Sequence, residues 1–246
     1  MKVLTRSDER ESGQFPVTRW TLVLESQGSD DDARKRALSH ICEAYWYPIY
    51  CFVRRRGLSP ADAEDSTQSF FCDLLEHNRF QNFSEDKGKL RAYLLTSIKR
   101  YLRNEWVASR AQKRGGGLAP LSLDAELAEK RYEVEPSEFA SPVQLFELRW
   151  ALTVLERALG RVKAHYEEQG KDEVFAEFRH HLSGDGDLSF REVGVKLGVG
   201  ESTARVMLFR MRKLYRSCIE EEIGRTIVDG ESVEEEIDYL NRIFAN

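Results

Sequence analysis

The chain has 246 residues, of which 41% are hydrophobic, so it is long and apolar enough to bury a core. It has no apolar stretch of about 20 residues that could span a membrane, and its N-terminal segment lacks the apolar core of a signal peptide, which indicates a cytoplasmic protein. The composition, with 32% charged residues and only 6 prolines, favours an all-α fold over a loop-rich β fold.

The charges are unevenly distributed, although the formal net charge is only -5. Basic residues dominate residues 89–114 and 201–216, whereas acidic residues dominate residues 124–138 and the chain after Arg216. The small net charge is therefore a sum over opposed segments. Such asymmetry is typical of a nucleic-acid-binding protein with acidic linkers.

The first half of the chain is predicted to contain several helices. Residues 31–46 have a helical pattern, and Gly57 suits the end of the turn that follows. Ser59 and Pro60 then supply an N-cap and a first-turn proline for a helix that ends near Glu76. This helix has an apolar face, and we expect its acids to point outward on the opposite face.

The next predicted helix runs from about Gly88 to Gln112 and has a broad apolar face at helical spacing. Beside that face, Lys99, Arg103, Trp106 and Arg110 follow one another at i, i+4, i+7 and i+11. Such a stripe suits a phosphate backbone with a base stacked on the indole. The alternative is a solvated basic face with the indole partly in the core.

Residues 115–140 begin with a run of glycines and break the helical pattern, so they are interpreted as a linker. Ser141, Pro142 and Gln144 then provide a cap, a first-turn proline and a capping-box residue for a helix to about Gly170, with another helix over residues 171–182. The predicted organisation is an N-terminal extension (1–29), a helical domain (30–114), an acidic linker (115–140), a second helical domain (141–223) and an acidic extension (224–246).

The segment from Ser189 to Tyr215 has the pattern of a helix-turn-helix. Ser189 and Glu192 form a capping box for a short helix ending near Leu197. Gly198 can adopt the left-handed conformation of the turn, and Gly194 leaves room for the following helix.

The second helix of this pair has two distinct faces. One face is apolar and is expected to pack in the core, and the other combines polar, apolar and basic residues. A recognition helix contacts base edges with its first residues and phosphates with its later cations, and this order is present here. An amphipathic helical hairpin without DNA binding is the alternative. The core face comprises Ala204, Leu208, Met211 and Tyr215, and the outer face Ser202, Val206, Phe209 and Lys213, flanked by Arg205, Arg210 and Arg216.

No catalytic site, metal site or cofactor site is predicted. The cysteines are widely spaced without a CxxC pair, and are interpreted as reduced and mostly buried. The histidines are scattered without a partnered nucleophile, and no phosphate-binding GxxxxGK[ST] loop is present. The acidic turn at residues 183–187 lacks the later ligands of a calcium loop. These features argue against an enzyme.

The order of these segments resembles that of bacterial extracytoplasmic-function (ECF) sigma factors. DAEDSTQSFFCDLL (62–75) looks like the family's core-polymerase-binding helix, and residues 88–114 are similar to its promoter-melting and -10-reading helix. Residues 188–215 are similar to its -35-reading helix-turn-helix. The resemblance covers residues 30–222.

The resemblance implies a protein that binds core RNA polymerase and directs it to promoters, with no cofactor and no catalysis of its own. Implied partners are the β' clamp and β flap of the polymerase, promoter DNA, and an anti-sigma factor or another regulator. The implied polymerase-binding residues are Asp62, Glu64, Asp65 and Gln68; the -10 DNA-binding residues are Lys99, Arg100, Arg103, Asn104, Trp106, Arg110, Lys113 and Arg114; and the -35 DNA-binding residues are Ser202, Thr203, Arg205, Val206, Phe209, Arg210, Arg212 and Lys213.

Two questions remain open at this stage. A helix-turn-helix regulator that never contacts polymerase is the alternative function, although the acidic helix from Pro60 to Glu76 would then be superfluous. The C-terminal extension contains the amphipathic segment IDYLNRIF (237–244). We expect it either to pack on a domain as a structural cap or to mask a basic face, because its charge is opposite.

Overall fold

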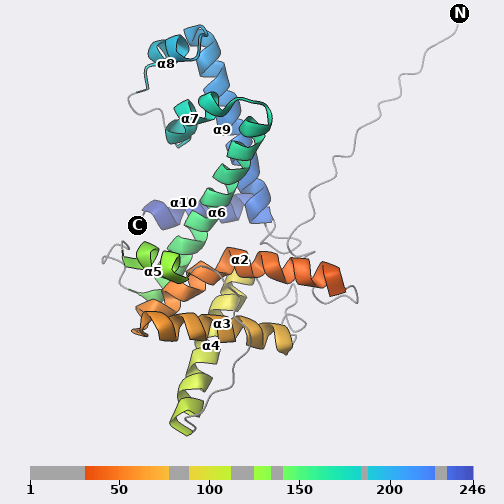
Figure 1. Ribbon diagram of the computed structural model, residues 1–246, viewed down its shortest axis with the longest axis vertical. Coiled ribbons are helices and arrows are strands. Elements are labelled where there is room, and N and C mark those ends of the chain that lie inside the picture. Colours follow the sequence, from red (N-terminus) through yellow and green to blue (C-terminus); the bar gives the residue numbers. More distant parts are fainter. Residues whose placement is uncertain are drawn as a thin grey trace, which may run out of the picture.

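The computed structural model describes residues 31–77, 89–111, 125–133, 141–183, 188–224 and 232–245. Every regular element in these residues is helical, which confirms the all-α prediction (Figure 1). The helices are α2 (Asp31–Arg55), α3 (Pro60–Glu76), α4 (Leu90–Ala111), α5 (Ala125–Glu133), α6 (Pro142–Glu168), α7 (Asp172–Phe178) with a 3-10 turn (Arg179–His181), α8 (Phe190–Lys196), α9 (Glu201–Gly224) and α10 (Val233–Ala245).

The helices enclose two hydrophobic cores. The larger core surrounds the second half of α2, where the residues from Ile41 to Val53 are almost all buried. Helices α3, α4 and α5, the first half of α6 and residues of α9 and α10 pack around it. The smaller core joins the second half of α6 to α7, α8 and α9.

Local signals place α3 as the sequence predicts. The Ser59 hydroxyl accepts a hydrogen bond from the Asp62 backbone N–H at 3.2 Å, and Pro60 begins the helix. Satisfying one free N–H at the helix start stabilises the helix by about 1 kcal/mol. The predicted apolar face is buried: Ala63, Thr67, Phe70, Phe71 and Leu74.

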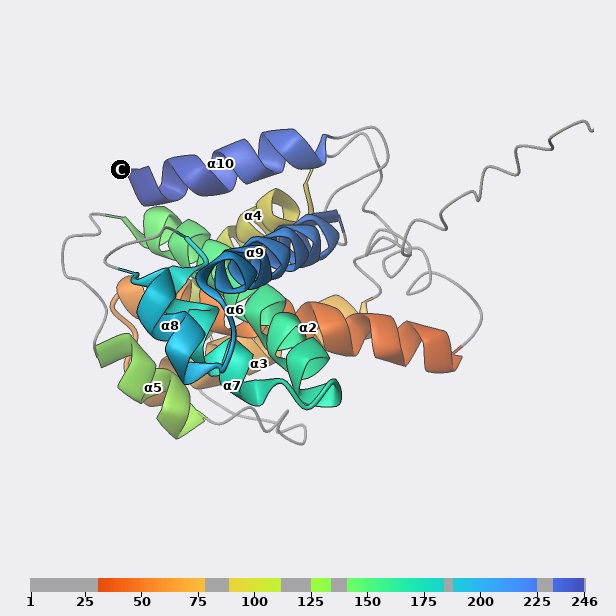
Figure 2. The same cartoon turned by 90° about the horizontal axis from the view of Figure 1, so that it is seen from above.

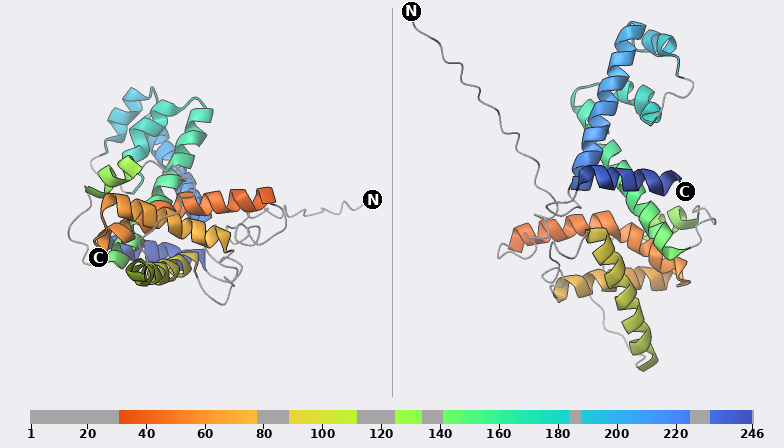
Figure 3. Two further views of the ribbon diagram at one scale, coloured as in Figure 1. Left: turned by 60° about the horizontal axis from the view of Figure 1, so that its bottom comes forward. Right: turned by 180° about the vertical axis from the view of Figure 1, so that it is seen from behind.

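Helix α6 connects the two cores. It begins at the predicted capping box of Ser141 and Gln144, and its 27 residues span about 40 Å. Its first half packs in the larger core and its second half in the smaller one, where it lies antiparallel to α9 (Figures 1 and 3). The residues assigned to the second domain from the sequence, 141–223, therefore contribute to both cores.

Residues 115–140, interpreted as a linker because the helical pattern breaks there, include the short helix α5. This helix packs on the end of α2, where Arg54 binds the Glu129 carboxylate through two hydrogen bonds of 2.9 and 2.7 Å. Tyr50 also donates a hydrogen bond to Glu129, and Tyr132 lies against the Arg54 guanidinium. A nine-residue helix is only marginally stable alone, so these tertiary contacts account for its formation.

Candidate nucleic-acid interface

The helix-turn-helix forms as the glycines predict. Ser189 caps α8 by accepting a hydrogen bond from the Glu192 backbone N–H. Gly198 has a φ of 65°, in the left-handed region that favours glycine. A Cβ atom on Gly194 would lie 2.7 Å from the Val199 carbonyl oxygen, so this close approach of two backbones requires glycine. The turn therefore fixes α9 against α8.

Helix α9 divides into the two faces that the sequence predicts. Ala204, Leu208 and Met211 are buried in the smaller core, and Tyr215 is half-buried. Exposed on the opposite face are Ser202, Thr203, Arg205, Val206, Phe209, Arg210 and Lys213. This burial pattern aims a mixed basic and apolar surface outward at one end of the molecule (Figure 1).

Arg205 is held in position on this surface. Its guanidinium forms an ion pair with Glu201 at 2.8 Å and lies 4.3 Å from the ring centre of Phe190. Both contacts keep the planar group oriented before any ligand arrives. Sequence reasoning missed the role of Phe190, because no local pattern shows which ring of α8 reaches a cation of α9.

Two large apolar side chains lie among the cations of α9. Phe209 is 67% exposed and Val206 is 44% exposed, and Val195 of α8 is 78% exposed. Isolated exposed apolar residues are common on protein surfaces. Here Val206 and Phe209 share the helix face of Arg205 and Arg210, so one surface offers both charge and apolar contact.

Arg212 differs from the other basic residues assigned to this interface. It is half-buried, and its guanidinium donates two hydrogen bonds, of 3.0 and 2.6 Å, to the carbonyl oxygen of His181. These bonds attach the 3-10 turn after α7 to α9. Arg212 thus stabilises the packing of the helix-turn-helix through hydrogen bonds within the protein.

A second basic surface lies on α4. Lys99, Arg100, Arg103 and Asn104 are exposed, while the apolar face from Leu90 to Ile98 packs in the larger core. The side chains of Trp106 and Arg110 and the whole of Lys113 and Arg114 lie outside the described residues.

The acid within this basic segment, Glu105, is directed toward α3. It accepts hydrogen bonds from Tyr101 at 3.0 Å and from Ser66 at 3.2 Å. Burial and the neighbouring Glu105 carboxylate both raise the pKa of the Tyr101 hydroxyl, which therefore remains a hydrogen-bond donor. The contacts of Glu105 leave the exposed side of α4 basic.

A polar face on α3 contains the residues assigned to polymerase binding. Asp62 and Asp65 are exposed, and Glu64 and Gln68 are half-buried. Gln68 donates a hydrogen bond to Glu64 at 3.4 Å, and Ser59 donates one to Asp62 at 2.6 Å. The structure therefore brings these four residues together along the first turns of one helix.

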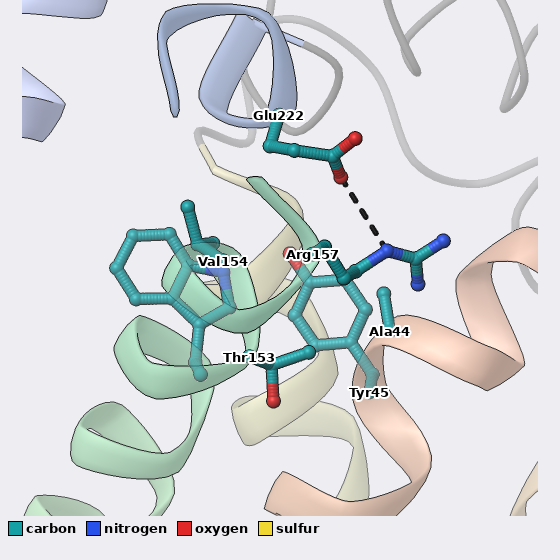
Figure 4. Close-up of a pocket in the computed structure, with 7 residues that line it drawn as sticks. Ala44, Tyr45, Thr153, Val154, Arg157 and Glu222 are labelled. Atoms are coloured by element: carbon teal, nitrogen blue, oxygen red, sulfur yellow. Dashed lines mark ion pairs between the residues drawn. The ribbon is translucent and has the colours of Figure 1, made fainter. Parts of the chain in front are cut away.

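The junction of α2, α6 and α9 contains a small cavity (Figure 4). Its volume of about 10 Å³ matches a single water molecule. Beside it, Arg157 forms an ion pair with the buried Glu222 at 3.4 Å. The cavity is thus too small for a cofactor, and the described residues contain no cluster of three potential metal ligands.

The cysteines are free, as predicted. Cys42, Cys51 and Cys218 are buried, and Cys72 is half-buried. Burial raises the pKa of the Cys42 thiol to about 12, which keeps it protonated and unreactive. Within the described residues, no helix is long and apolar enough to cross a membrane.

An all-helical protein that exposes the basic outer face of a helix-turn-helix belongs to the class of DNA-binding proteins. The family model of ECF sigma factors matches residues 62–218, which is more than half of the chain. The chain therefore belongs to the ECF sigma factor family, and it acts as a sigma factor in transcription initiation, with RNA polymerase core and promoter DNA as its partners. Searches of curated proteins and of solved structures found no match.

Proposed function

We propose that the chain binds core RNA polymerase through α3 and recognises promoters at two places, the -10 element through α4 and the -35 element through α9. The observation that carries this proposal is the outer face of α9, where exposed cations and exposed apolar groups follow a tight glycine turn. This surface favours a recognition helix over an amphipathic hairpin without DNA binding. The outer face of such a hairpin would not need exposed cations and exposed apolar side chains together.

The -35 element is assigned to the first turns of α9. Arg205 is oriented to donate two hydrogen bonds to a guanine edge in the major groove. Val206 and Phe209 suit the 5-methyl groups of thymines, since apolar side chains contact this group in the same groove. Arg210 and Lys213 lie further along the helix, where they suit phosphates.

The -10 element is assigned to the second half of α4. Lys99, Arg100 and Arg103 are exposed cations for the backbone of a separated strand, and Asn104 can hydrogen bond to a base. Trp106 follows in the sequence as a stacking platform, together with the cations Arg110, Lys113 and Arg114.

Polymerase binding is assigned to the polar face of α3. Asp62, Glu64 and Asp65 present carboxylates, and Gln68 adds an amide, so the face is complementary to a basic helical surface such as the β' clamp. A stand-alone DNA-binding regulator would have no use for such a face.

Run-off transcription with purified core enzyme tests the function. Genomic fragments bound by the reconstituted holoenzyme are selected, sequenced and used as templates. We expect initiation that depends on the added chain and on the template sequence. Failure to initiate from every selected fragment would overturn the proposal, and DNA binding without core enzyme would then favour a stand-alone regulator.

A further inference from the structure

The first turns of α9 carry a guanidinium that two neighbouring side chains hold. Arg205 and Glu201 lie four residues apart on the helix, and their ion pair joins Arg205 Nη2 to Glu201 Oε1 at 2.8 Å. The ring of Phe190, from α8, has its centre 4.3 Å from Arg205 Cζ. The side chains of Arg205 and Glu201 are nevertheless 59% and 50% exposed. The guanidinium is therefore held and accessible to a ligand at the same time.

The Phe190 ring is itself fixed by the helix-turn-helix. It belongs to the first residue of α8, directly after the Ser189 cap, and it packs on the smaller core. The Val199 backbone N–H donates a hydrogen bond of 2.8 Å to the carbonyl oxygen of Gly194, which attaches the turn to α8. Figure 2 looks onto this end of the molecule, where α8 lies beside α9. The ring thus gives Arg205 a rigid support.

An unrestrained arginine on a DNA-binding surface has two kinds of partner. Phosphate oxygens occur along every duplex, whereas a guanine edge that accepts two hydrogen bonds occurs only at certain base pairs. A flexible guanidinium that turns to the phosphates adds affinity without sequence preference. Arg205 can turn in that way only by losing the Glu201 carboxylate and leaving the Phe190 ring. Its two contacts therefore favour a base edge over a phosphate.

The hydrogen bond to Glu201 leaves donors of Arg205 available for a base. A guanidinium has five N–H donors in a planar fork, and the bond to Glu201 uses one of them, on Nη2. Guanine needs two donors, one for O6 and one for N7. Arg205 can therefore keep its contact with Glu201 while it binds a guanine edge.

Glu201 has the opposite charge to the cations of this surface. It lies in the first turn of α9, the part of a recognition helix that faces base edges. A carboxylate at this place repels the phosphates of every duplex, which lowers affinity without regard to sequence. Arg205 compensates this charge only while it stays beside Glu201. The carboxylate therefore weakens DNA binding in general and disfavours an Arg205 that has turned to a phosphate.

We propose that Phe190 and Glu201 are positioning residues that keep Arg205 directed at a base edge and away from the phosphates, and that they thereby set how strongly the -35 surface discriminates between sequences. This inference rests on the proposed function. The ring acts by orientation, whereas the carboxylate acts by tethering and by charge, so their losses change affinity in opposite directions. Without the ring, the correct duplex binds more weakly. Without the carboxylate, incorrect duplexes bind more tightly.

The first experiment measures the restraint on Arg205 in the free chain, without any assumption about promoters. Nuclear magnetic resonance relaxation of the arginine Nε–H groups reports side-chain order, and the signal that disappears in Arg205→Lys identifies Arg205. Phe190→Leu keeps apolar bulk but removes the ring face, and Glu201→Gln removes the charge of the pair. Each change should lower the order of the Arg205 side chain. Phe190→Tyr keeps the ring and should retain the wild-type order.

Glu220→Gln is the matched control for the loss of an ion pair. It removes the pair of Arg216 with Glu220, which is also 2.8 Å long and also joins residues four apart, at the other end of α9. This variant should loosen Arg216 and leave Arg205 unchanged, which shows that the measurement detects such a loss. Unchanged order of Arg205 in both Phe190→Leu and Glu201→Gln would overturn the proposal.

The second experiment measures discrimination by the holoenzyme. Fluorescence anisotropy with a labelled -35 duplex from a selected promoter, and with its single-base variants, gives the preference for the selected sequence. We expect this preference to fall about threefold in Phe190→Leu and about twofold in Glu201→Gln, as the loss of an exposed cation–π contact and of an exposed ion pair predicts. Phe190→Tyr and Glu220→Gln should match the wild-type protein.

The salt dependence of binding reports where the guanidinium has gone. On a duplex without the selected sequence, the slope of the logarithm of affinity against that of salt concentration should become steeper by about 0.9 in Phe190→Leu and Glu201→Gln, because Arg205 then reaches one more phosphate. Equal slopes in all proteins would contradict a turn of Arg205 to the phosphates.

The outcomes are distinguishable. If Arg205 loosens but the preference is unchanged, positioning does not set discrimination and the proposal is wrong. A lower preference with an unchanged Arg205 signal would mean that the variants act through helix packing, which also contradicts the proposal, and thermal melting of each variant detects such a loss of packing. If the wild-type holoenzyme prefers no duplex, the proposed function fails and discrimination fails with it, while the resonance measurement still decides whether Arg205 is held.

Discussion

Helices α4 and α9 are both basic in sequence, but they use their cations differently. On α9, Arg205 faces solvent and is oriented by Glu201 and Phe190. On α4, Arg91 is enclosed by Glu236, Tyr239 and Trp150. The comparison teaches that a run of cations in the sequence does not by itself define a nucleic-acid interface. Cations that are occupied by tertiary contacts within the protein have to be excluded first.

The largest effect is expected for Arg91→Ala, which should lower the free energy of unfolding. This change leaves the buried Glu236 carboxylate with Lys89 as its remaining cation and removes the contacts with two aromatic rings. Breaking a buried ion pair by removing one partner costs about 3 kcal/mol. Urea denaturation followed by circular dichroism should show this loss. Arg100→Ala, exposed on the same helix, is the matched control, and an equal loss there would contradict the distinction between the two cations.

Arg205→Ala should have the opposite effect: it should weaken DNA binding and leave the stability of the fold unchanged. We expect its free energy of unfolding to stay near that of the wild-type protein, because the side chain is exposed. Its contribution to binding should be about 1–3 kcal/mol and should depend on sequence if the guanidinium reads a base edge. Fluorescence anisotropy with holoenzyme and a set of single-base variants of a -35 duplex measures this. An equal loss on every duplex would instead identify Arg205 as a phosphate contact.

A smaller effect is expected for polymerase binding by the polar face of α3. Asp62 and Asp65 are exposed on this helix, as the cations are on α9. Changing Asp65 and Gln68 together to Ala should weaken binding to core polymerase by about 1 kcal/mol, because solvent-exposed charged contacts contribute little individually. Titration of labelled chain with core enzyme measures the affinity. Glu76→Gln, at the other end of the same helix, should leave it unchanged, and identical affinities for all three proteins would show that the interface lies elsewhere.

The smallest effect concerns pH. Burial alone would raise the pKa of the Glu236 carboxyl, but the hydrogen bonds and charges of Arg91 and Lys89 outweigh it and lower this pKa below its ordinary value of 4.5. Because the folded-state pKa is the lower one, the contribution to stability is present above the ordinary value and is lost as the pH falls through the folded-state pKa. Denaturation between pH 6 and pH 3 should therefore show a steeper decline for the wild-type protein than for Glu236→Gln. Parallel curves would contradict a paired, ionised Glu236.

Local sequence signals predicted much of the fold. The cap at Ser59, the capping box of Ser141 and Gln144, and the left-handed Gly198 each act within a few residues, so they identify helix ends and the turn directly. Helical periodicity likewise predicted the buried and exposed faces of α3 and α9. Most of the candidate site follows from these local rules.

The parts that were missed depend on contacts between residues far apart in the chain. Helix α5 is held by the pairing of Glu129 with Arg54, which are 75 residues apart. The inward position of Arg212 depends on the carbonyl of His181, 31 residues away. A pattern read along the sequence contains no information on such partners.

The sequence by itself therefore determined most of the helices other than α5, the capped ends of α3, α6 and α8, and the apolar faces of α3 and α9, because propensity, capping and periodicity are short-range. Only the tertiary structure decided which cations are exposed. Arg91 and Arg205 have the same side chain. Arg91 is paired with the carboxylate of Glu236, 145 residues further along the chain, whereas Arg205 remains exposed at the surface. The free energy of burying a charge depends on its partners in space, so the packing of α10 on α4 settles the role of Arg91.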